Sequence, residues 1–160
     1  MSGLLLGGGY PELHLEALSS NETMLASIKS AIDAGMPSVA ECGGFMYLHS
    51  VISSMQGRPY KTVGVIDGKC TYTGHLVNFG YVQVTKAPNE ALSGLKGHEF
   101  HYYDSTCCGS DLTLYKPSSQ STYEAGMAGD DHLWGFAHFY YPSHPEAASA
   151  FVRKMREYGR

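Results

Sequence analysis

One cysteine of this chain, Cys42, stands where a short apolar run meets two glycines, in the sequence Pro37-Ser38-Val39-Ala40-Glu41-Cys42-Gly43-Gly44-Phe45. This order predicts a buried strand, a sharp turn and a helix that begins directly after the turn, which is the arrangement of a nucleophile elbow. Backbone amides at the start of a helix favour the thiolate, the form of cysteine that attacks carbon. We therefore predict that Cys42 is a nucleophile for acyl chemistry.

The alternative for Cys42 is a structural role, since unpaired cysteine is among the most buried residue types. The two following glycines favour the nucleophile, because they let the chain turn tightly and leave the sulfur uncovered. The other cysteines lack this context: Cys70 lies in a β-like run, and Cys107 and Cys108 lie in a polar loop without C-x-x-C spacing. We expect these three to be reduced thiols without a chemical role, and we expect no metal site.

A cysteine nucleophile needs a base, and His138 is the best placed of the eight histidines. It lies in the apolar run 133–140, which we predict as one buried strand. A buried imidazole needs a hydrogen-bond partner, so a core histidine with no catalytic role is the alternative. If the run 97–102 is a strand, His98 and His101 point to opposite faces, which argues against a shared metal. The remaining histidines are expected at the surface: His14, His49, His75, His132 and His144.

The elements that position these residues follow from the hydrophobic pattern. The apolar run 3–6 predicts a strand that ends in the glycine loop 7–9. Ser19 to Glu22 resembles a capping box, and the apolar residues after it have helical spacing as far as Gly35. Strand, helix and strand in this order predict a right-handed βαβ unit with parallel strands.

The segment from about 62 to 103 has a different character, with short β-rich runs separated by turn residues, which predicts antiparallel strands and hairpins. Residues 112–115 form another predicted strand, and residues 118–122 a polar loop. Ser143 to Glu146 is a second predicted capping box, before an amphipathic C-terminal helix. The expected fold class is α/β, a partial Rossmann-like or flavodoxin-like sheet with flanking helices and an antiparallel middle segment.

Size and composition narrow the range of functions. A chain of 160 residues with 43% hydrophobic residues suffices for one domain with a real core, spanning residues 1–160. A net charge of -4 with only 11 Lys and Arg gives no basic surface for nucleic acid or anionic membrane. There is no apolar run of membrane-spanning length and no signal peptide, so we expect a cytoplasmic protein with a small-molecule substrate.

Four motifs together resemble the C-terminal glutaminase domain of the cobyrinic acid a,c-diamide synthase family. They occur in the family's order and cover most of the chain: residues 7–13 (GGGYPEL), 40–48 (AECGGFMYL), 79–82 (FGYV) and 97–102 (GHEFHY). The resemblance implies a class I glutamine amidotransferase-like domain of the cobyric acid synthase type. Such a domain hydrolyses glutamine and passes ammonia to an ATP-dependent synthetase domain, where the acceptors are the a and c carboxylates of the corrinoid cobyrinic acid.

Carried over to this sequence, Cys42 matches the nucleophile that forms a γ-glutamyl thioester, and His138 matches its base. The amides of Gly43 and of Gly8 or Gly9 are candidate donors to the oxyanion. Glu12, His98, Glu99 and His101 lie in the shared motifs and are candidates for structural or substrate-positioning roles. The alternative for residues 7–9 is a turn that only ends a strand. It is not a phosphate loop, because no Gly-Lys-Ser/Thr follows.

The sequence departs from the family pattern at two places. Ordinary class I amidotransferases carry an acid two positions after the histidine, whereas here that position is Tyr140, so His138 lacks its usual orienting carboxylate. The synthetase domain, with its ATP and Mg²⁺, has no counterpart in this chain, and the first strands of the glutaminase domain would precede Gly3. We therefore expect a fragment that needs no cofactor of its own and self-associates through exposed apolar surface.

Two alternatives to a glutaminase follow from the same residues. One is a non-catalytic remnant or binding module that keeps the amidotransferase fold. The other is an unrelated hydrolase that shares only the cysteine elbow, against which the 97–102 motif speaks.

Overall fold

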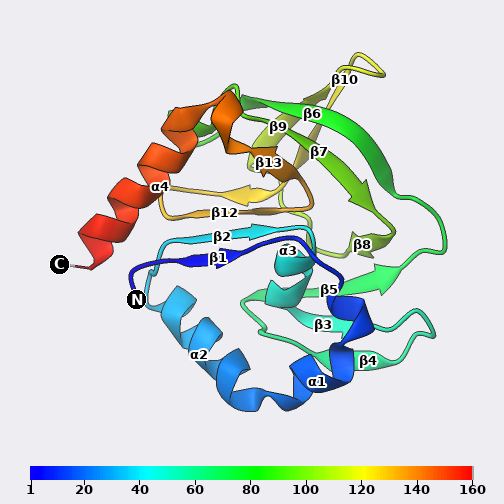
Figure 1. Cartoon of the computed structure of the whole chain (residues 1–160). Coiled ribbons are helices and arrows are strands. Elements are labelled where there is room, and N and C mark those ends of the chain that lie inside the picture. The colour runs from blue at the N-terminus through cyan, green and yellow to red at the C-terminus, as the bar shows by residue number, and fades with distance from the viewer. Residues whose placement is uncertain (160) are drawn as a thin grey trace.

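The computed structural model describes residues 1–159 and folds around three β-sheets. The central sheet has the order β1-β2-β12-β11, and three of its strands are parallel (Figure 1). The three parallel strands are β1 (Leu4–Leu6), β2 (Ser38–Glu41) and β12 (His132–Gly135), and the fourth, antiparallel strand is the short β11 (Met127–Ala128). The predicted strand at residues 3–6 and its parallel partner before Cys42 are confirmed.

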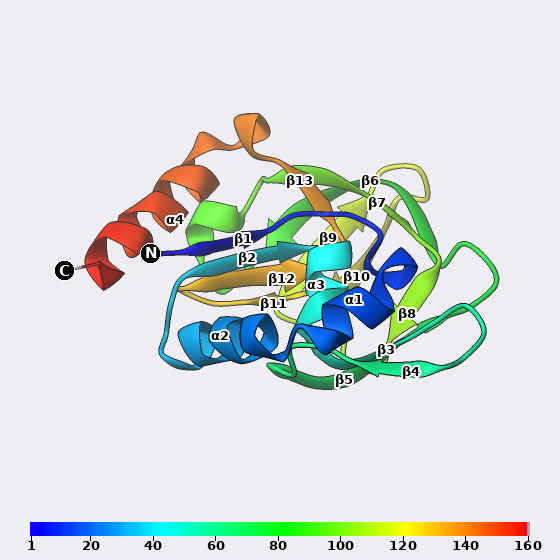
Figure 2. The same ribbon diagram turned by 60° about the horizontal axis from the view of Figure 1, so that its bottom comes forward.

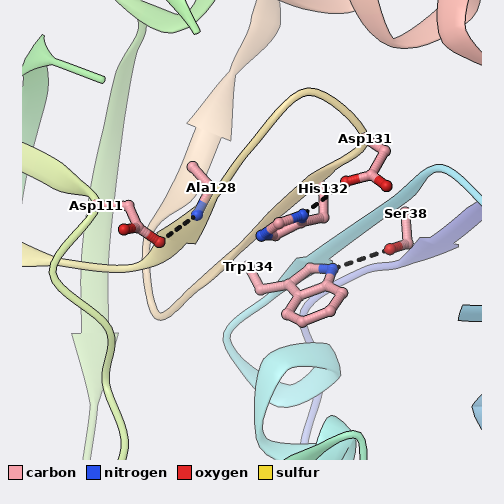
Figure 3. A network of polar contacts seen from close by, with 6 residues as sticks. All are labelled: Ser38, Asp111, Ala128, Asp131, His132 and Trp134. Atoms are coloured by element: carbon pink, nitrogen blue, oxygen red, sulfur yellow. Dashed lines mark hydrogen bonds and ion pairs between the residues drawn. The ribbon is translucent and has the colours of Figure 1, made fainter. Parts of the chain in front are cut away.

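The two inner strands of the central sheet, β2 and β12, are covered on both faces. Val39 and Leu133 pack into one buried cluster, whereas their neighbours Ala40 and Trp134 pack into another. The indole nitrogen of Trp134 also donates a 3.0 Å hydrogen bond to the Ser38 hydroxyl, which joins β12 to the start of β2 (Figure 3). The sheet therefore separates the two halves of the core.

The second sheet is wholly antiparallel and has the order β10-β9-β6-β7-β13. Its strands are β6 (Asn78–Lys86), β7 (Lys96–His101), β9 (Leu112–Lys116), β10 (Ser121–Ala125) and β13 (His138–Tyr140). The third sheet has the order β4-β3-β5-β8 and mixes parallel and antiparallel pairs. Its strands are β3 (His49–Ser53), β4 (Pro59–Lys61), β5 (Ile66–Tyr72) and β8 (Tyr103–Ser105). The α/β class with an antiparallel middle segment is thus confirmed.

The helices are α1 (Leu15–Ser20), α2 (Glu22–Asp33), α3 (Gly43–Leu48) and α4 (Pro145–Tyr158), with 3-10 turns at Pro11–Leu13, Glu90–Leu92 and Tyr141–Ser143. Helix α2 and α4 lie on different sides of the central sheet, and α3 lies at the end of β1 and β2 (Figures 1 and 2). In the described part of the chain every helix is too short or too polar to cross a lipid bilayer.

Both predicted capping boxes are wrong in detail. Helix α2 is capped by Asn21, whose side chain accepts a hydrogen bond from the Met24 amide, because a separate helix α1 ends at Ser20. Helix α4 begins after His144 with Pro145 at its first turn, and no side chain caps it. The Ser143 hydroxyl instead accepts a hydrogen bond from the Lys96 amide at 3.0 Å.

The predicted single strand over residues 133–140 is also wrong, because the run divides between two sheets. β12 pairs with β2 in the central sheet, whereas β13 pairs with β7 in the second. Between them Phe136 turns into the core and packs edge-on against Phe45, with ring centroids 5.1 Å apart. Gly97 permits the close approach of β13, since a Cβ there would lie 2.4 Å from the His138 carbonyl oxygen.

One histidine expected at the surface, His49, is fully buried. Its ring contacts the Phe45 carbonyl oxygen at 2.9 Å and the Ser105 hydroxyl at 2.6 Å. Both ring nitrogens are satisfied, so the imidazole serves as a polar bridge inside the core.

Candidate active site

Cys42 occupies the turn between β2 and α3 in a backbone conformation that few residues other than glycine adopt, with φ 47° and ψ -106°. The turn is held in place because the Cys42 amide donates a 2.8 Å hydrogen bond to the Gly135 carbonyl of β12. A strained residue fixed between a strand and a helix is the geometry predicted for the nucleophile elbow.

The two glycines after Cys42 allow the start of α3 to pack directly on other backbone. A Cβ at Gly44 would lie 2.1 Å from the Leu6 carbonyl oxygen, and one at Gly43 would lie 2.4 Å from the Gly9 carbonyl oxygen. The glycine loop after β1 is therefore brought against the elbow. Because the contact to Gly43 uses the carbonyl of Gly9, this oxygen is turned toward the elbow.

Cys42 opens into a cavity of about 230 Å³ whose walls come from the glycine loop, from α3 and from the β5, β7 and β8 region. The cavity is smaller than the ~300–1,000 Å³ of sites for drug-sized ligands. Its lining residues are Gly9, Tyr10, Glu12, Cys42, Met46, Met55, Tyr72, Phe100, His101, Tyr102 and Tyr103.

The thiol of Cys42 is harder to ionise than an ordinary cysteine. Burial raises its pKa to about 11, the amide of Gly43 opposes this rise, and the negative charges of Glu12, Glu99 and Glu41 add to it. The amide of Gly43 at the start of α3 does favour the thiolate, as expected, but its effect is smaller than the opposing ones. Removal from water and the three nearby acids outweigh the amides of a helix of only six residues.

His138 lies on β13 directly opposite His98 of β7, and the two rings stack with centroids 5.0 Å apart. The ring also packs on the glycine loop, because a Cβ at Gly8 would lie 2.2 Å from its Cε1 atom. Burial lowers the His138 pKa below its ordinary value, and His98 and His101 lower it further, so the ring is neutral at pH 7. His138 is absent from the cavity wall, and no hydrogen bond joins it to the Cys42 sulfur within residues 1–159.

The second histidine of the 97–102 motif does line the cavity with Cys42. His101 is buried, its Nδ1 lies 2.7 Å from the Tyr103 carbonyl oxygen, and its ring stacks on Phe136 at 3.9 Å. The hydrogen bond to a carbonyl requires Nδ1 to carry a proton. His98, in contrast, is on the exposed side of β7, so the prediction that the two histidines face opposite ways is confirmed.

The two acids of the shared motifs have different surroundings. Glu99 is only 3% exposed, and its carboxylate accepts hydrogen bonds from Asn78 and from the Tyr123 hydroxyl, the latter at 2.8 Å. Glu12 lies in the cavity wall beside Cys42, and burial raises its pKa against the opposing effect of its own backbone amide. Glu99 thus belongs to a satisfied network, whereas Glu12 faces the cavity.

Sequence reasoning did not single out Glu41, Tyr103 and Tyr141. Glu41 accepts hydrogen bonds from the Tyr141 hydroxyl and the Phe139 amide, and Tyr103 lines the cavity. Exposed and buried side chains alternate along β7, where Glu99 and His101 are buried. Continuing this alternation by two residues could have indicated that Tyr103 is buried on the same side.

In the part of the chain that the structure describes, no group of three or more His, Cys, Asp or Glu side chains is arranged to hold a metal ion.

Residues 1–135 match the model of the CobB/CobQ-like glutamine amidotransferase domain. The chain belongs to this family. It is 35% identical to the cobyrinate a,c-diamide synthase of Caldanaerobacter subterraneus subsp. tengcongensis over 99% of its length, and 32% identical to the hydrogenobyrinate a,c-diamide synthase of Pseudomonas aeruginosa over 98%. The match covers 36% and 35% of those proteins, so this amidotransferase domain spans about a third of the length of its curated relatives.

Solved structures agree on the fold of this CobB/CobQ-like domain. A crystal structure of a glutamine amidotransferase superposes with a TM-score of 0.59 at 14% identity, covering 98% of this chain and 80% of that one. The structure of PurLQS from Thermotoga maritima superposes with a TM-score of 0.55 at 16% identity, again over 98% of this chain and 80% of that one. The family match also argues against an unrelated cysteine hydrolase.

Proposed function

We propose that this chain hydrolyses glutamine through a thioester on Cys42. The supporting observation is the strained turn that fixes Cys42 in the wall of a cavity of about 230 Å³, in a domain of an amidotransferase family. Because the free thiol has a pKa of about 11, attack requires a base, and we assign this role to His138, which is neutral at pH 7.

In the proposed reaction the thiol proton passes to His138 as the sulfur bonds to the amide carbon of glutamine. The resulting oxyanion accepts hydrogen bonds from the amide of Gly43 and from that of Gly8 or Gly9. The carbon–nitrogen bond then breaks, and His138 returns the proton to the departing ammonia. Water, deprotonated by the same ring, hydrolyses the thioester to glutamate and restores the thiol.

The relatives carry the names cobyrinate and hydrogenobyrinate a,c-diamide synthase, so we propose that the ammonia serves to amidate the a and c carboxylates of cobyrinic acid or a close corrinoid in cobalamin biosynthesis. This step requires a synthetase domain or subunit as partner, to which we assign ATP, Mg²⁺ and the corrinoid. The amidotransferase chain itself is proposed to need no cofactor and to act in the cytoplasm.

A second candidate function is a non-catalytic amidotransferase-like module. Two observations favour it: the Cys42 pKa is about 11, and the described residues provide no hydrogen bond from the sulfur to His138. The release of glutamate from free glutamine distinguishes a glutaminase from a non-catalytic module. A coupled dehydrogenase assay measures this release, with Cys42→Ala as the blank. Turnover that vanishes in Cys42→Ala supports the glutaminase, and no turnover even with the synthetase partner present supports the module.

A further inference from the structure

Two buried polar atoms, on residues that line the cavity of Cys42, have no hydrogen-bond partner among residues 1–159. They are Oε2 of Glu12 and the hydroxyl oxygen of Tyr103, and both residues line the cavity. Tyr103 is only 3% exposed, so water outside the protein does not reach most of its side chain. Buried polar groups are nearly always satisfied, so two orphans in one cavity point to a ligand that supplies the missing partners.

The charge of Glu12 acts on both Tyr103 and the Cys42 thiol. The Glu12 charge contributes to the rise of the Tyr103 pKa to about 12, behind burial as the main cause, and it also contributes to the rise at Cys42. Glu12 therefore lies within electrostatic range of both residues. A ligand that pairs with Glu12 and Tyr103 at one end can present its other end to the sulfur.

The negative charge of the cavity favours the ammonium group of an amino acid over its carboxylate. Among residues 1–159, no lysine or arginine lines the cavity, and Glu12 is the one acidic residue that does. The walls beside it are aromatic, from Tyr72, Phe100 and Tyr102. An unpaired carboxylate against such walls is costly, and pairing with a cation removes much of that cost. An ammonium group, with three donors and no acceptor, complements a carboxylate oxygen and a phenol oxygen together.

We propose that Glu12 and Tyr103 bind the α-ammonium group of the substrate glutamine and so select free amino acids over amides that lack this charge. The inference rests on the proposed glutaminase function and deepens it by naming the residues that set substrate specificity. Glu12 supplies the charge-assisted hydrogen bond and Tyr103 the neutral one. Neither residue takes part in proton transfer at the amide.

The test compares glutamine with glutaramate, which has the same amide and chain but no α-amino group. Glu12→Gln should lower kcat/KM for glutamine by roughly 10²-fold and leave the value for glutaramate unchanged, because the variant removes a charge that only glutamine uses. Tyr103→Phe should lower the glutamine value by about tenfold. Glu16→Gln, at an exposed carboxylate on the neighbouring helix α1, is the matched control and should change neither.

A second readout does not depend on turnover. The rate at which 6-diazo-5-oxo-L-norleucine, which carries an α-ammonium group, modifies Cys42 should fall in Glu12→Gln, while the rate with iodoacetamide should not fall. If Glu12→Gln affects both substrates and both reagents equally, the ammonium site is refuted while the glutaminase stands. If the wild-type chain neither turns over glutamine nor reacts with the diazo-ketone, the proposed function and the ammonium site are both refuted.

Discussion

The carboxylate of Glu41 accepts a 2.7 Å hydrogen bond from the hydroxyl of Tyr141, a residue 100 positions further along the chain. The same oxygen also accepts a longer bond, 3.4 Å, from the Phe139 amide. Glu41 is the last residue of β2 and directly precedes Cys42, whereas Phe139 directly follows His138 on β13. One acid therefore ties the strand of the proposed nucleophile to the strand of its proposed base.

This link leads to the first prediction. Glu41→Ala should lower kcat for glutamine roughly tenfold to a hundredfold, because His138 loses its alignment with Cys42. Tyr141→Phe removes only the shorter bond and should lose less. Ser38→Ala, which removes the bond from Trp134 at the other end of β2, is the matched control and should keep full activity (Figure 3).

A double-mutant cycle separates alignment from general stability. In a His138→Ala background Glu41→Ala should cost little further activity, since its effect passes through the missing ring. An undiminished loss in that background, or an equal loss in Ser38→Ala, would show that Glu41 does not act by positioning His138.

The second prediction concerns the reactivity of the four cysteines. A glutamine-mimicking diazo-ketone should label Cys42 first, because Cys70 is fully buried whereas Cys42 lines the cavity that we propose binds glutamine. Peptide mass spectrometry after brief exposure identifies the site. Equal or faster labelling of Cys70, Cys107 or Cys108 would contradict the assignment of Cys42 as nucleophile.

The pH dependence of simple alkylation tests the state of the same thiol. The Cys42 pKa is about 11, so without His138 its reaction with iodoacetamide should rise about tenfold per pH unit from pH 7 to 10. The measurement uses His138→Ala with intact-mass detection and peptide mapping. A rate that is already constant at pH 8 would mean that the thiolate is stabilised after all.

The third prediction assigns the base. His138→Ala should lower kcat roughly 10²- to 10⁴-fold in a folded protein. Burial and the neighbouring histidines lower the His138 pKa. The apparent pKa on the acid side of the wild-type kcat/KM profile should therefore lie below 6.5, the ordinary value for histidine. His101→Ala is the comparison, since His101 lines the Cys42 cavity. A larger loss in His101→Ala would assign the base to that residue.

The fourth prediction uses the glycine loop. Gly8→Ala should reduce activity to near the level of His138→Ala, because the added methyl would lie 2.2 Å from the imidazole and must displace it. Gly7→Ala is the matched control, since a Cβ there meets no atom within 4 Å. Glutamate release and a thermal melt of both variants decide the matter. Full activity of Gly8→Ala would show that the His138 position is not important.

The cysteine elbow could be predicted from sequence because its causes are local. An apolar run followed by Cys42 and two glycines determines the turn, and the structure adds that Gly44 is required by the Leu6 carbonyl. The absence of an acid at position 140 could also be seen in the sequence. In the structure the side chain of Tyr140 is 64% exposed, so it does not orient His138 from within the core.

The remaining features of the site depend on contacts that are distant in sequence. The division of the 133–140 run between two sheets depends on pairing with β2 and β7, and an apolar run alone does not reveal it. The link from Glu41 to Tyr141 and the raised pKa of Cys42 arise from burial and from acids on separate elements. Local patterns thus located the reacting groups, but the assembled core determines their orientation and ionisation.

The last prediction concerns self-association. β1 is an edge strand of the central sheet, and its middle residue Leu5 is 67% exposed beside an apolar cavity of about 200 Å³. An unpaired edge with an exposed apolar side chain is a template for pairing with another chain. We expect the protein to self-associate through this edge, and Leu5→Lys should shift the average mass in light scattering toward the monomer. Met24→Lys, at an exposed apolar residue on α2, should leave the mass unchanged. A monomer across the whole concentration series, or an equal response of both variants, would show that the β1 edge does not drive association.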